Sequence, residues 1–334
     1  MGVRLIKSCI PWVGGKGKLL WIIDKLLPPR YTRFIDVFGG SGTVTFGRPI
    51  KRGCLQVYND FNRNLVNLFA CVKERPMALL KELSFLPLHS RDDFNVLCKF
   101  FRLEEFTDKY LEEEMLLTEQ YLPPPDADII RQLMTQRAER GDVRRAANYF
   151  KLIRESFCGG GKAFAGKDCD IRKFFYLIWE CSRRLADVVV ENKDFESLIH
   201  QYDREGAIIY CDPPYYEAES CYDAPFGAED HIRLRDTVLH AQGCVMISYN
   251  YCPQVMELYQ ENFYIFYTTR HNSMSQKAGS IYEELIITNY DPREFANTQI
   301  HQMTLFGLNA EDEDEEKYSL INEPTNKKYI RRIP

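Results

Sequence analysis

Residues 208–216 (IIYCDPPYY) join a short apolar run to two prolines and two tyrosines, and they contain the side chain best placed for chemistry, Asp212. The run at 208–210 has the continuous apolar pattern of a strand that is buried on both faces of a parallel sheet. Proline cannot donate to a sheet ladder and holds the residue before it in extended geometry. Pro213 and Pro214 therefore end the strand and fix Asp212 at its carboxyl end, the edge at which open α/β sheets bind ligands.

A carboxylate in this position can activate an amino group that is otherwise a poor nucleophile. In an exocyclic amine on an aromatic base, the nitrogen lone pair is delocalised into the ring. The Asp212 carboxylate and the Pro213 carbonyl could each accept one N–H hydrogen bond, which would localise that lone pair for attack on a sulfonium methyl group. The same acceptors would stabilise the positive charge that develops on nitrogen, and Tyr215 could stack on a base extruded from a duplex. The alternative is a rigid Pro-Pro turn with a capping aspartate and packed rings.

A second candidate site is the glycine-rich turn FGGSG at residues 38–42, which follows an apolar strand and precedes a helical pattern. Glycines at such a turn let the backbone approach a ligand closely. The turn does not match the dinucleotide fingerprint, and residues 14–20 do not match a P-loop because Leu19 replaces the hydroxyl that would hold magnesium. Asp60 ends the next strand about twenty residues later, where a carboxylate can bind ribose hydroxyls. A nucleoside without phosphates fits this pattern, with a plain strand-to-helix turn as the alternative.

The elements around these motifs predict a parallel sheet. After the strand, turn and helix of residues 31–47, strand-like runs occur at 55–60, 187–195, 207–212, 243–250, 264–270 and 283–290. Their alternation with helical segments predicts an α/β fold with a doubly wound, mostly parallel sheet. The segment from 61 to about 157 is helical in pattern and interrupts this alternation, so we expect an inserted, mainly helical domain.

Composition indicates a soluble cytoplasmic protein. The chain has 334 residues, 45% of them hydrophobic, which suits one large domain or two coupled ones. It contains neither an apolar stretch long enough to span a membrane nor a signal-peptide pattern. Its eleven cysteines form no C-x-x-C pair and its six histidines no ligand pattern, so we expect reduced thiols and no metal.

Charge is distributed unevenly along the chain, although the net charge is only −5. Residues 103–128 contain nine acidic side chains against one lysine, whereas residues 131–184 contain thirteen Lys or Arg against six Asp or Glu. A basic segment within an acidic protein can form an anion-binding face, and nucleic acid is one candidate ligand. A solvated helix surface is the alternative.

Several motifs together resemble the Dam-type family of adenine-N6 DNA methyltransferases, which use S-adenosylmethionine. The matching segments, in the order of the family, are PWVGGKGKLL (11–20), FIDVFGGSGTV (34–44), VYNDFN (57–62), VENKDF (190–195), CDPPYY (211–216) and EELIITNY (283–290). The resemblance implies that Asp60 binds the cofactor ribose, Asp194 the cofactor amino group and Phe195 its adenine ring. The full implied cofactor set is Trp12, Lys16, Asp36, Phe38, Gly40, Ser41, Gly42, Asp60, Asp194 and Phe195, and the implied catalytic set is Asp212, Pro213, Pro214 and Tyr215.

The resemblance also implies the domain organisation and the reaction. Residues 1–70 and 158–292 would form the catalytic domain, 71–157 the DNA target-recognition domain, and 293–334 a polar, flexible tail. The reaction would be site-specific methylation of adenine N6 in double-stranded DNA, by base flipping and direct transfer, without a metal or a covalent enzyme intermediate. Methyl transfer to RNA adenine or to a protein glutamine amide remains an alternative, as does a catalytically silent DNA-binding protein. Asp212 favours DNA, because amide-modifying relatives usually have Asn there.

Two further interpretations concern partners. We expect DNA contacts from basic residues of the central segment, of the glycine-rich loop that follows it and of one later strand, namely Arg144, Arg145, Lys151, Arg154, Lys162 and Arg270. Near the C-terminus, Gln302, Leu305 and Phe306 resemble the Q-x-x-L-F peptide that docks bacterial sliding clamps, in which leucine and phenylalanine fill an apolar pocket. A packed terminal element is the alternative for this short match.

Overall fold

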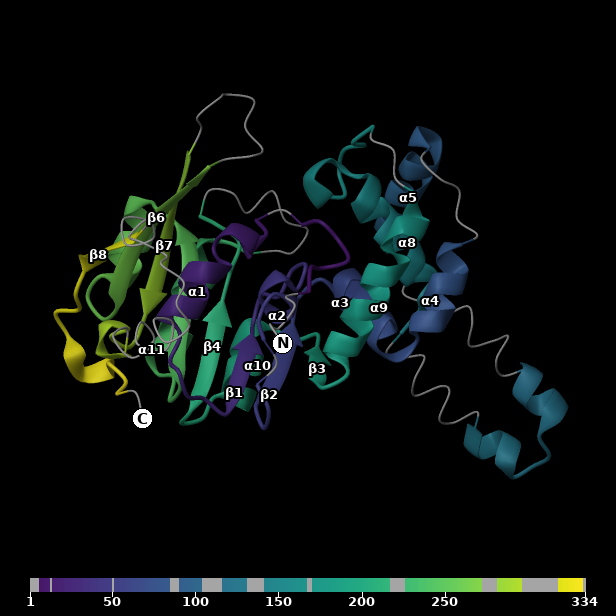
Figure 1. Ribbon diagram of the computed structural model, residues 1–334, viewed down its shortest axis with the longest axis horizontal. Coiled ribbons are helices and arrows are strands. Elements are labelled where there is room, and N and C mark those ends of the chain that lie inside the picture. The colour runs from purple at the N-terminus through teal and green to yellow at the C-terminus, as the bar shows by residue number, and fades with distance from the viewer. Residues whose placement is uncertain are drawn as a thin grey trace, which may run out of the picture. The chain divides into compact units, whose positions relative to one another are not determined.

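The computed structural model in Figure 1 describes residues 6–12, 14–49, 51–84, 90–103, 116–130, 141–166, 170–216, 226–271, 281–295 and 318–332. The chain divides into two compact units. The first consists of Met1–Gly15, Gly40–Phe46 and Asn62–Asn192, and the second of Lys16–Gly39, Gly47–Phe61 and Lys193–Pro334.

The second unit is built on a mixed sheet whose central strands are parallel. Its strands are β1 (Arg33–Asp36), β2 (Leu55–Asn59), β4 (Ala207–Cys211), β5 (Cys244–Asn250), β6 (Tyr264–His271), β7 (Ile281–Thr288) and β8 (Tyr318–Asn322). They lie in the order β2-β1-β4-β5-β7-β6-β8. Strands β2, β1, β4 and β5 pair in parallel, and β7, β6 and β8 continue the sheet with antiparallel pairings.

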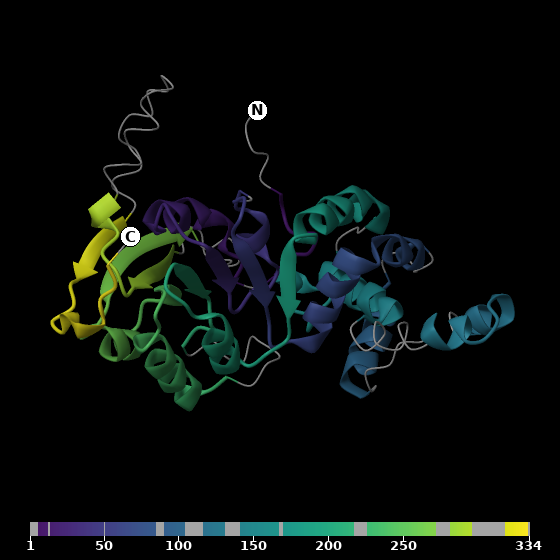
Figure 2. The ribbon, with the colours of Figure 1, turned by 90° about the horizontal axis from the view of Figure 1, so that it is seen from below.

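Helices cover this sheet on both faces. They are α1 (Leu20–Leu26), α10 (Phe195–Tyr202), α11 (Ala228–Leu239) and α12 (Pro253–Tyr259). Figure 2 shows the purple helix α1 on one side of the sheet and the green helices that include α11 on the other. Every residue of β4 is buried, as expected for a central strand covered on both faces. The predicted doubly wound α/β fold is therefore confirmed.

The first unit is mainly helical. It contains α2 (Thr43–Phe46), α3 (Arg63–Glu74), α4 (Pro76–Leu83), α5 (Arg91–Leu103), α8 (Val143–Glu155), α9 (Phe175–Leu185) and the short strand β3 (Val188–Glu191). The N-cap Asn62 accepts hydrogen bonds from two backbone N–H groups of α3, and the N-cap Asp142 accepts one from α8. Asn67 and Asp142 exchange two hydrogen bonds of 2.9 and 2.7 Å, which fixes α8 against α3.

This unit is larger than the predicted recognition domain. It includes residues 71–157 but also 158–192, which we expected in the catalytic domain, because α9 packs against α3 and α4. The sequence pattern could not show this, since α9 has the amphipathic periodicity of any surface helix. The role of residues 71–157 in recognising DNA stays a prediction.

The C-terminal segment differs from the flexible tail that the sequence suggested. Strand β8 extends the sheet beside β6, and the Asn322 side chain donates hydrogen bonds of 2.8 and 3.0 Å to the carbonyl groups of Gln260 and Phe263. The Arg331 N–H donates to the Asn289 carbonyl at 2.7 Å. The tail is thus ordered over 318–332, whereas the predicted clamp-binding residues Gln302, Leu305 and Phe306 lie outside the described residues.

In the described part of the chain, no helix combines the length and apolar character needed to cross a membrane. Within the same residues, no group of three or more His, Cys, Asp or Glu side chains is arranged to hold a metal ion.

Candidate active site

Asp212 directly follows β4, the strand between β1 and β5, and its carboxylate is held by two donors. Ser248 on β5 donates its hydroxyl to Oδ1 of Asp212 at 2.9 Å. The ammonium group of Lys16 lies 2.7 Å from the same oxygen. Both contacts are made to Oδ1, so the protein orients this carboxylate through one of its two oxygens.

The two donors come from parts of the unit where side chains have little freedom. Lys16 begins a short 3₁₀ turn (Lys16–Lys18) and is only 2% exposed. Ser248 is fully buried, and its oxygen lies 3.0 Å from the hydroxyl of Tyr210. A serine hydroxyl has one hydrogen, so when Ser248 donates to Asp212 its own oxygen accepts from Tyr210. The predicted catalytic residue is therefore supported by one neighbouring strand, β5, and by the turn that begins at Lys16.

The surroundings of Asp212 act on its pKa in opposite directions. Burial raises the pKa of this carboxyl group above its usual range, because the charged form loses hydration. The Lys16 ammonium and the hydrogen bond from Ser248 lower it, whereas the negative charge of Glu284 raises it further. Lys16 and Ser248 thus favour the ionised carboxylate in a place where burial opposes ionisation.

Tyr215 is connected to a second, deeper charge pair. Its hydroxyl donates to Oε2 of Glu284, a fully buried side chain on β7, and Arg270 on β6 contacts Oε1 of the same carboxylate at 2.6 Å. Burial, followed by the charge of Glu284, raises the pKa of Tyr215 well above its usual range, so the phenol remains a donor. The Lys16 ammonium lies 4.7 Å from the centre of the Tyr215 ring. The stacking of Tyr215 on a flipped base stays a prediction.

Arg270 therefore has a different environment from the one expected. We predicted a contact with DNA phosphate, but its side chain is 14% exposed and paired with Glu284 inside the second unit. Glu284 itself was missed by the sequence analysis. The motif EELIITNY was recognised, but nothing in its local pattern distinguishes a buried glutamate from an exposed one.

A second cluster forms where β1 and β2 end and α10 begins. The Asn59 side chain is 1% exposed and donates to the Val37 carbonyl at 2.9 Å and the Lys193 carbonyl at 3.1 Å. It also accepts from the Lys193 N–H at 2.8 Å. Asn59 thereby ties three segments together and places Asp60 and Asp194, which follow in the chain, beside them. The sequence analysis missed Asn59, whose only signal was a polar residue that ends an apolar strand.

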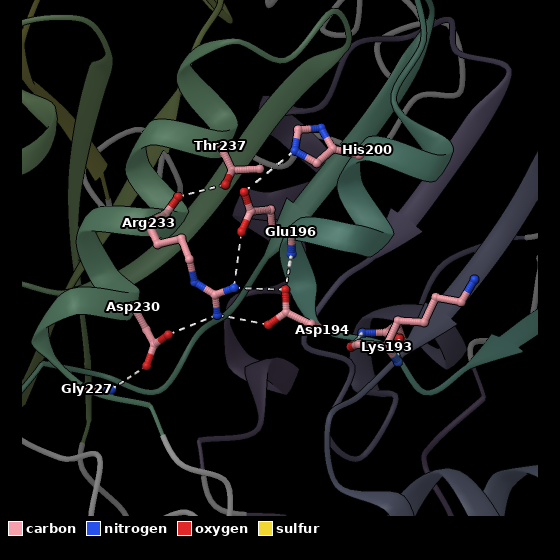
Figure 3. A network of polar contacts seen from close by, with 9 residues as sticks. Lys193, Asp194, Glu196, His200, Gly227, Asp230, Arg233 and Thr237 are labelled. Atoms are coloured by element: carbon pink, nitrogen blue, oxygen red, sulfur yellow. Dashed lines mark hydrogen bonds and ion pairs between the residues drawn. The ribbon is translucent and has the colours of Figure 1, made fainter.

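Asp194 caps α10 and is paired with an arginine from α11. Its Oδ1 accepts the Glu196 N–H at 3.0 Å, and Arg233 donates to both of its carboxylate oxygens (Figure 3). The Phe195 ring lies 5.7 Å from that of Phe38, measured between centroids. Two predicted cofactor residues, Asp194 and Phe195, and the ring of a third, Phe38, are thus adjacent. Asp36, also predicted, is the buried last residue of β1.

The remaining predicted cofactor residues belong to the first unit. Gly40 has φ +52°, and a Cβ there would lie 3.0 Å from the Trp12 ring, so the turn packs closely on this indole. Gly42 has φ +70°, and a Cβ would lie 2.5 Å from the Phe46 ring. Ser41 lies 2.6 Å from Thr43, measured between the hydroxyl oxygens. Local packing alone thus requires both glycines, and the binding of a cofactor by these residues stays a prediction.

The predicted DNA contacts of the first unit divide into buried and exposed residues. Arg145 is 6% exposed and donates to Asn64 at 2.7 Å, and Lys151 is 1% exposed beside Asp93. Their charges are used inside the helical packing, so neither side chain is exposed for the DNA contact that we predicted. Arg154 is partly buried, donates to the Cys9 carbonyl and stacks on a phenylalanine ring.

Arg144 and Lys162 remain the exposed candidates. Arg144 is 42% exposed, with its guanidinium 3.3 Å from Glu82. Lys162 lies in the glycine-rich segment 156–166, which is held by a bridge between Ser156 and Phe164. Contact of either residue with DNA stays a prediction.

Comparisons with known proteins give the family. The model of the D12 class of N6 adenine-specific DNA methyltransferases matches residues 12–133 and 176–274. The type II methyltransferase M1.LlaDCHI of Lactococcus lactis subsp. cremoris is 27% identical over 300 residues, 84% of this chain and 94% of that protein. The type II methyltransferase M.CviBI of Paramecium bursaria Chlorella virus NC1A is 21% identical over 85% of this chain and 100% of that protein. A DNA adenine methylase of Haemophilus influenzae is 25% identical over 62% of this chain and 63% of its own length. The chain therefore belongs to the D12 class of N6 adenine-specific DNA methyltransferases and is an enzyme that methylates adenine in DNA site-specifically.

Proposed function

We propose that this DNA methyltransferase takes its methyl group from S-adenosylmethionine and transfers it directly to N6 of an adenine flipped out of double-stranded DNA. The catalytic set is Asp212, Pro213, Pro214 and Tyr215. The observation that carries this assignment is the contact of Lys16 and Ser248 with one oxygen of Asp212, which orients its second oxygen for the substrate.

In this proposal the amino group of adenine donates one hydrogen to Oδ2 of Asp212 and the other to the Pro213 carbonyl. Two fixed acceptors draw the nitrogen towards tetrahedral geometry and localise its lone pair. Positive charge then develops on nitrogen, and the carboxylate stabilises it without reorganisation because its orientation is already set. Pro213 and Pro214 keep both acceptors rigid, since each proline ring fixes its backbone.

The residues of the second unit suit an adenosine group. Asp60 supplies an acceptor for ribose hydroxyls and Asp194 an acceptor for an amino group, and the rings of Phe38 and Phe195 give an apolar contact for a base. The bound cofactor would supply the electrophilic methyl group. Lys16, which we predicted as a cofactor residue, is supported instead as a partner of Asp212, because its ammonium contacts that carboxylate.

The assignment is tested by single-molecule sequencing of plasmid DNA from cells that express the protein. We expect N6-methyladenine within one short motif for the wild type and for Asp236→Ala, which removes a 58% exposed carboxylate. We expect none for Asp212→Ala. Binding of S-adenosylmethionine, measured by calorimetry, should survive in Asp212→Ala. Methylated DNA from that variant, or a folded wild type that does not bind the cofactor, would contradict the proposal.

We also propose that Gln302, Leu305 and Phe306 bind a bacterial sliding clamp. The support is their match to the Q-x-x-L-F pattern, in which two apolar side chains enter one pocket. A peptide of residues 298–310 should bind a purified clamp, and the same peptide with Leu305→Ala and Phe306→Ala should not. Absence of binding by the unaltered peptide would exclude this partner.

A further inference from the structure

Arg233 lies at the centre of an acidic cluster beside the predicted adenine site. Its guanidinium contacts Asp194 with Nη1–Oδ1 and Nη2–Oδ2 distances of 3.0 and 2.9 Å, Glu196 at 3.2 Å and Asp230 at 2.9 Å. Figure 3 shows these carboxylates, from α11 and from the start of α10, converging on the one guanidinium group. Its guanidinium carbon Cζ also lies 4.2 Å from the centre of the Phe195 ring.

The pairing with Asp194 is bidentate, and this determines which oxygen is available. Arg233 and Asp194 form two parallel N–H···O bonds, the geometry in which arginine fixes a carboxylate plane. Oδ1 accepts from Arg233 and also from the Glu196 N–H, so both of its lone pairs are used. Among the described contacts, Oδ2 has only one donor, the Nη2 group of Arg233. One acceptor position therefore remains on Oδ2.

The cluster has features that stability alone does not explain. Arg233 is 40% exposed, and its three carboxylate partners are 30 to 40% exposed. Ion pairs with this exposure contribute little to folding, because solvent screens them. Three carboxylates around one guanidinium also leave an excess of negative charge. What the arrangement does provide is a fixed Asp194 and a fixed Phe195 ring, both held by one residue from another helix.

We propose that Arg233 is a positioning residue for the adenine ring of the cofactor. It holds Asp194 so that Oδ2 accepts the exocyclic amino group, and it holds Phe195 so that its ring contacts the base. This inference rests on the assignment of Asp194 and Phe195 to the cofactor in the proposed function. It goes further by making the selectivity for an amino group depend on Arg233, a residue that no motif identifies.

The test compares two ligands that differ at C6 of the base. S-adenosylhomocysteine carries an amino group at C6, whereas S-inosylhomocysteine carries a carbonyl oxygen, which Oδ2 would repel, and a hydrogen on N1. Dissociation constants are measured by calorimetry for the wild type, Arg233→Ala, Arg233→Lys and Arg235→Ala. Arg235 is a matched control because it lies on the same helix and pairs with its neighbour Asp236.

We expect the wild type and Arg235→Ala to prefer the amino ligand by the same ratio. Arg233→Ala should bind S-adenosylhomocysteine roughly tenfold more weakly, which corresponds to one badly oriented hydrogen bond to a charged group. The preference of this variant for S-adenosylhomocysteine over S-inosylhomocysteine should fall by a similar factor. Arg233→Lys should show an intermediate preference, because an ammonium group cannot form the bidentate pair. In Asp194→Asn, adding Arg233→Ala should cause little further loss of preference, since both act through one carboxylate.

The outcomes separate this inference from the proposed function. If the wild type binds S-adenosylhomocysteine selectively and Arg233→Ala retains the wild-type ratio, the inference is wrong and the cofactor assignment stands. If Arg233→Ala loses the same factor in affinity for both ligands and has a lower unfolding temperature, Arg233 has a merely structural role. That result would also overturn the inference. If the folded wild type binds neither ligand, the cofactor assignment fails together with the inference.

Discussion

The hydrogen bond from Ser248 to Asp212 offers the sharpest test of the catalytic geometry. In Ser248→Ala the donor is lost, while the Lys16 contact with the same oxygen remains. The bond is 2.9 Å long, it is made by a fully buried serine, and its acceptor is charged. Such a bond contributes about 1.5–3 kcal/mol. If it is needed to orient the carboxylate in the transition state, kcat falls by roughly 10- to 150-fold.

The pH dependence of kcat gives a second measurement of the effect of Ser248→Ala. Ser248 lowers the pKa of Asp212, so its removal raises that pKa further above the usual range. The ionised carboxylate is the active form, and activity is lost as the pH falls through the pKa of Asp212 in the folded enzyme. The acid limb of the profile of kcat against pH should therefore move to higher pH in Ser248→Ala.

The assay is the initial rate of transfer of a labelled methyl group to a duplex, measured at saturating cofactor between about pH 5 and pH 9. Tyr210→Phe is the control, because it removes the other hydroxyl beside Ser248, 3.0 Å away, but leaves the donor to Asp212 in place. We expect its acid limb to match the wild type. A Ser248→Ala enzyme with a wild-type rate and an unmoved acid limb would refute the role assigned to this bond.

Three further predictions concern the same charges and one glycine. Lys16→Met removes the cation that lowers the pKa of Asp212, so its acid limb should also move to higher pH, and kcat should fall. Glu284→Gln removes a charge that raises this pKa, so the acid limb should move to lower pH; an unchanged or opposite shift would contradict the electrostatic picture. The free energy of unfolding of the same variant, measured in urea, should be about 3 kcal/mol lower than that of the wild type, because a buried ion pair is broken. Gly159→Ala should lower the unfolding temperature more than Gly166→Ala: both have positive φ, but only at Gly159 would a Cβ meet backbone, at 2.5 Å. Equal decreases in the unfolding temperature of the two variants would contradict the prediction that the backbone contact at Gly159 matters.

The sequence predicts best the features that depend on local chemistry. The apolar run of β4 and the prolines after it place Asp212 at the carboxyl end of a central strand, and the structure has this arrangement. The sequence predicts less well the partners that come from other strands. Ser248 reaches Asp212 because β5 pairs in parallel with β4, and Glu284 reaches Tyr215 because β7 turns back beside β5. Both depend on strand order and register, which no local pattern contains.

Charge patterns have a similar limit. The basic excess of residues 131–184 suggested a DNA-binding face, yet Arg145 and Lys151 are buried against polar and acidic partners from other helices. A count of charges along the chain does not distinguish a solvated cation from one paired inside a unit. The edge strand β8 was missed for a related reason, since five residues of alternating burial are too short to stand out in a polar tail.

Two ion pairs of the second unit, Lys16–Asp212 and Arg270–Glu284, lie close to Tyr215 and have to be considered together. Burial favours the neutral form of Asp212, and Asp212 and Glu284 each face their own cation, Lys16 or Arg270. Each negative charge also raises the pKa of its neighbours, as Glu284 does for Asp212. A reaction that develops positive charge on nitrogen gains from nearby negative charge, provided that Asp212 remains ionised. Lys16 lowers the pKa of Asp212 and so favours its ionised form, whereas Arg270 pairs with Glu284. Tyr215 links the two pairs by donating to Glu284. This arrangement explains why removal of either cation should impair catalysis more than removal of an exposed charge, and why the shifts of the acid limb should differ in sign between Lys16→Met and Glu284→Gln.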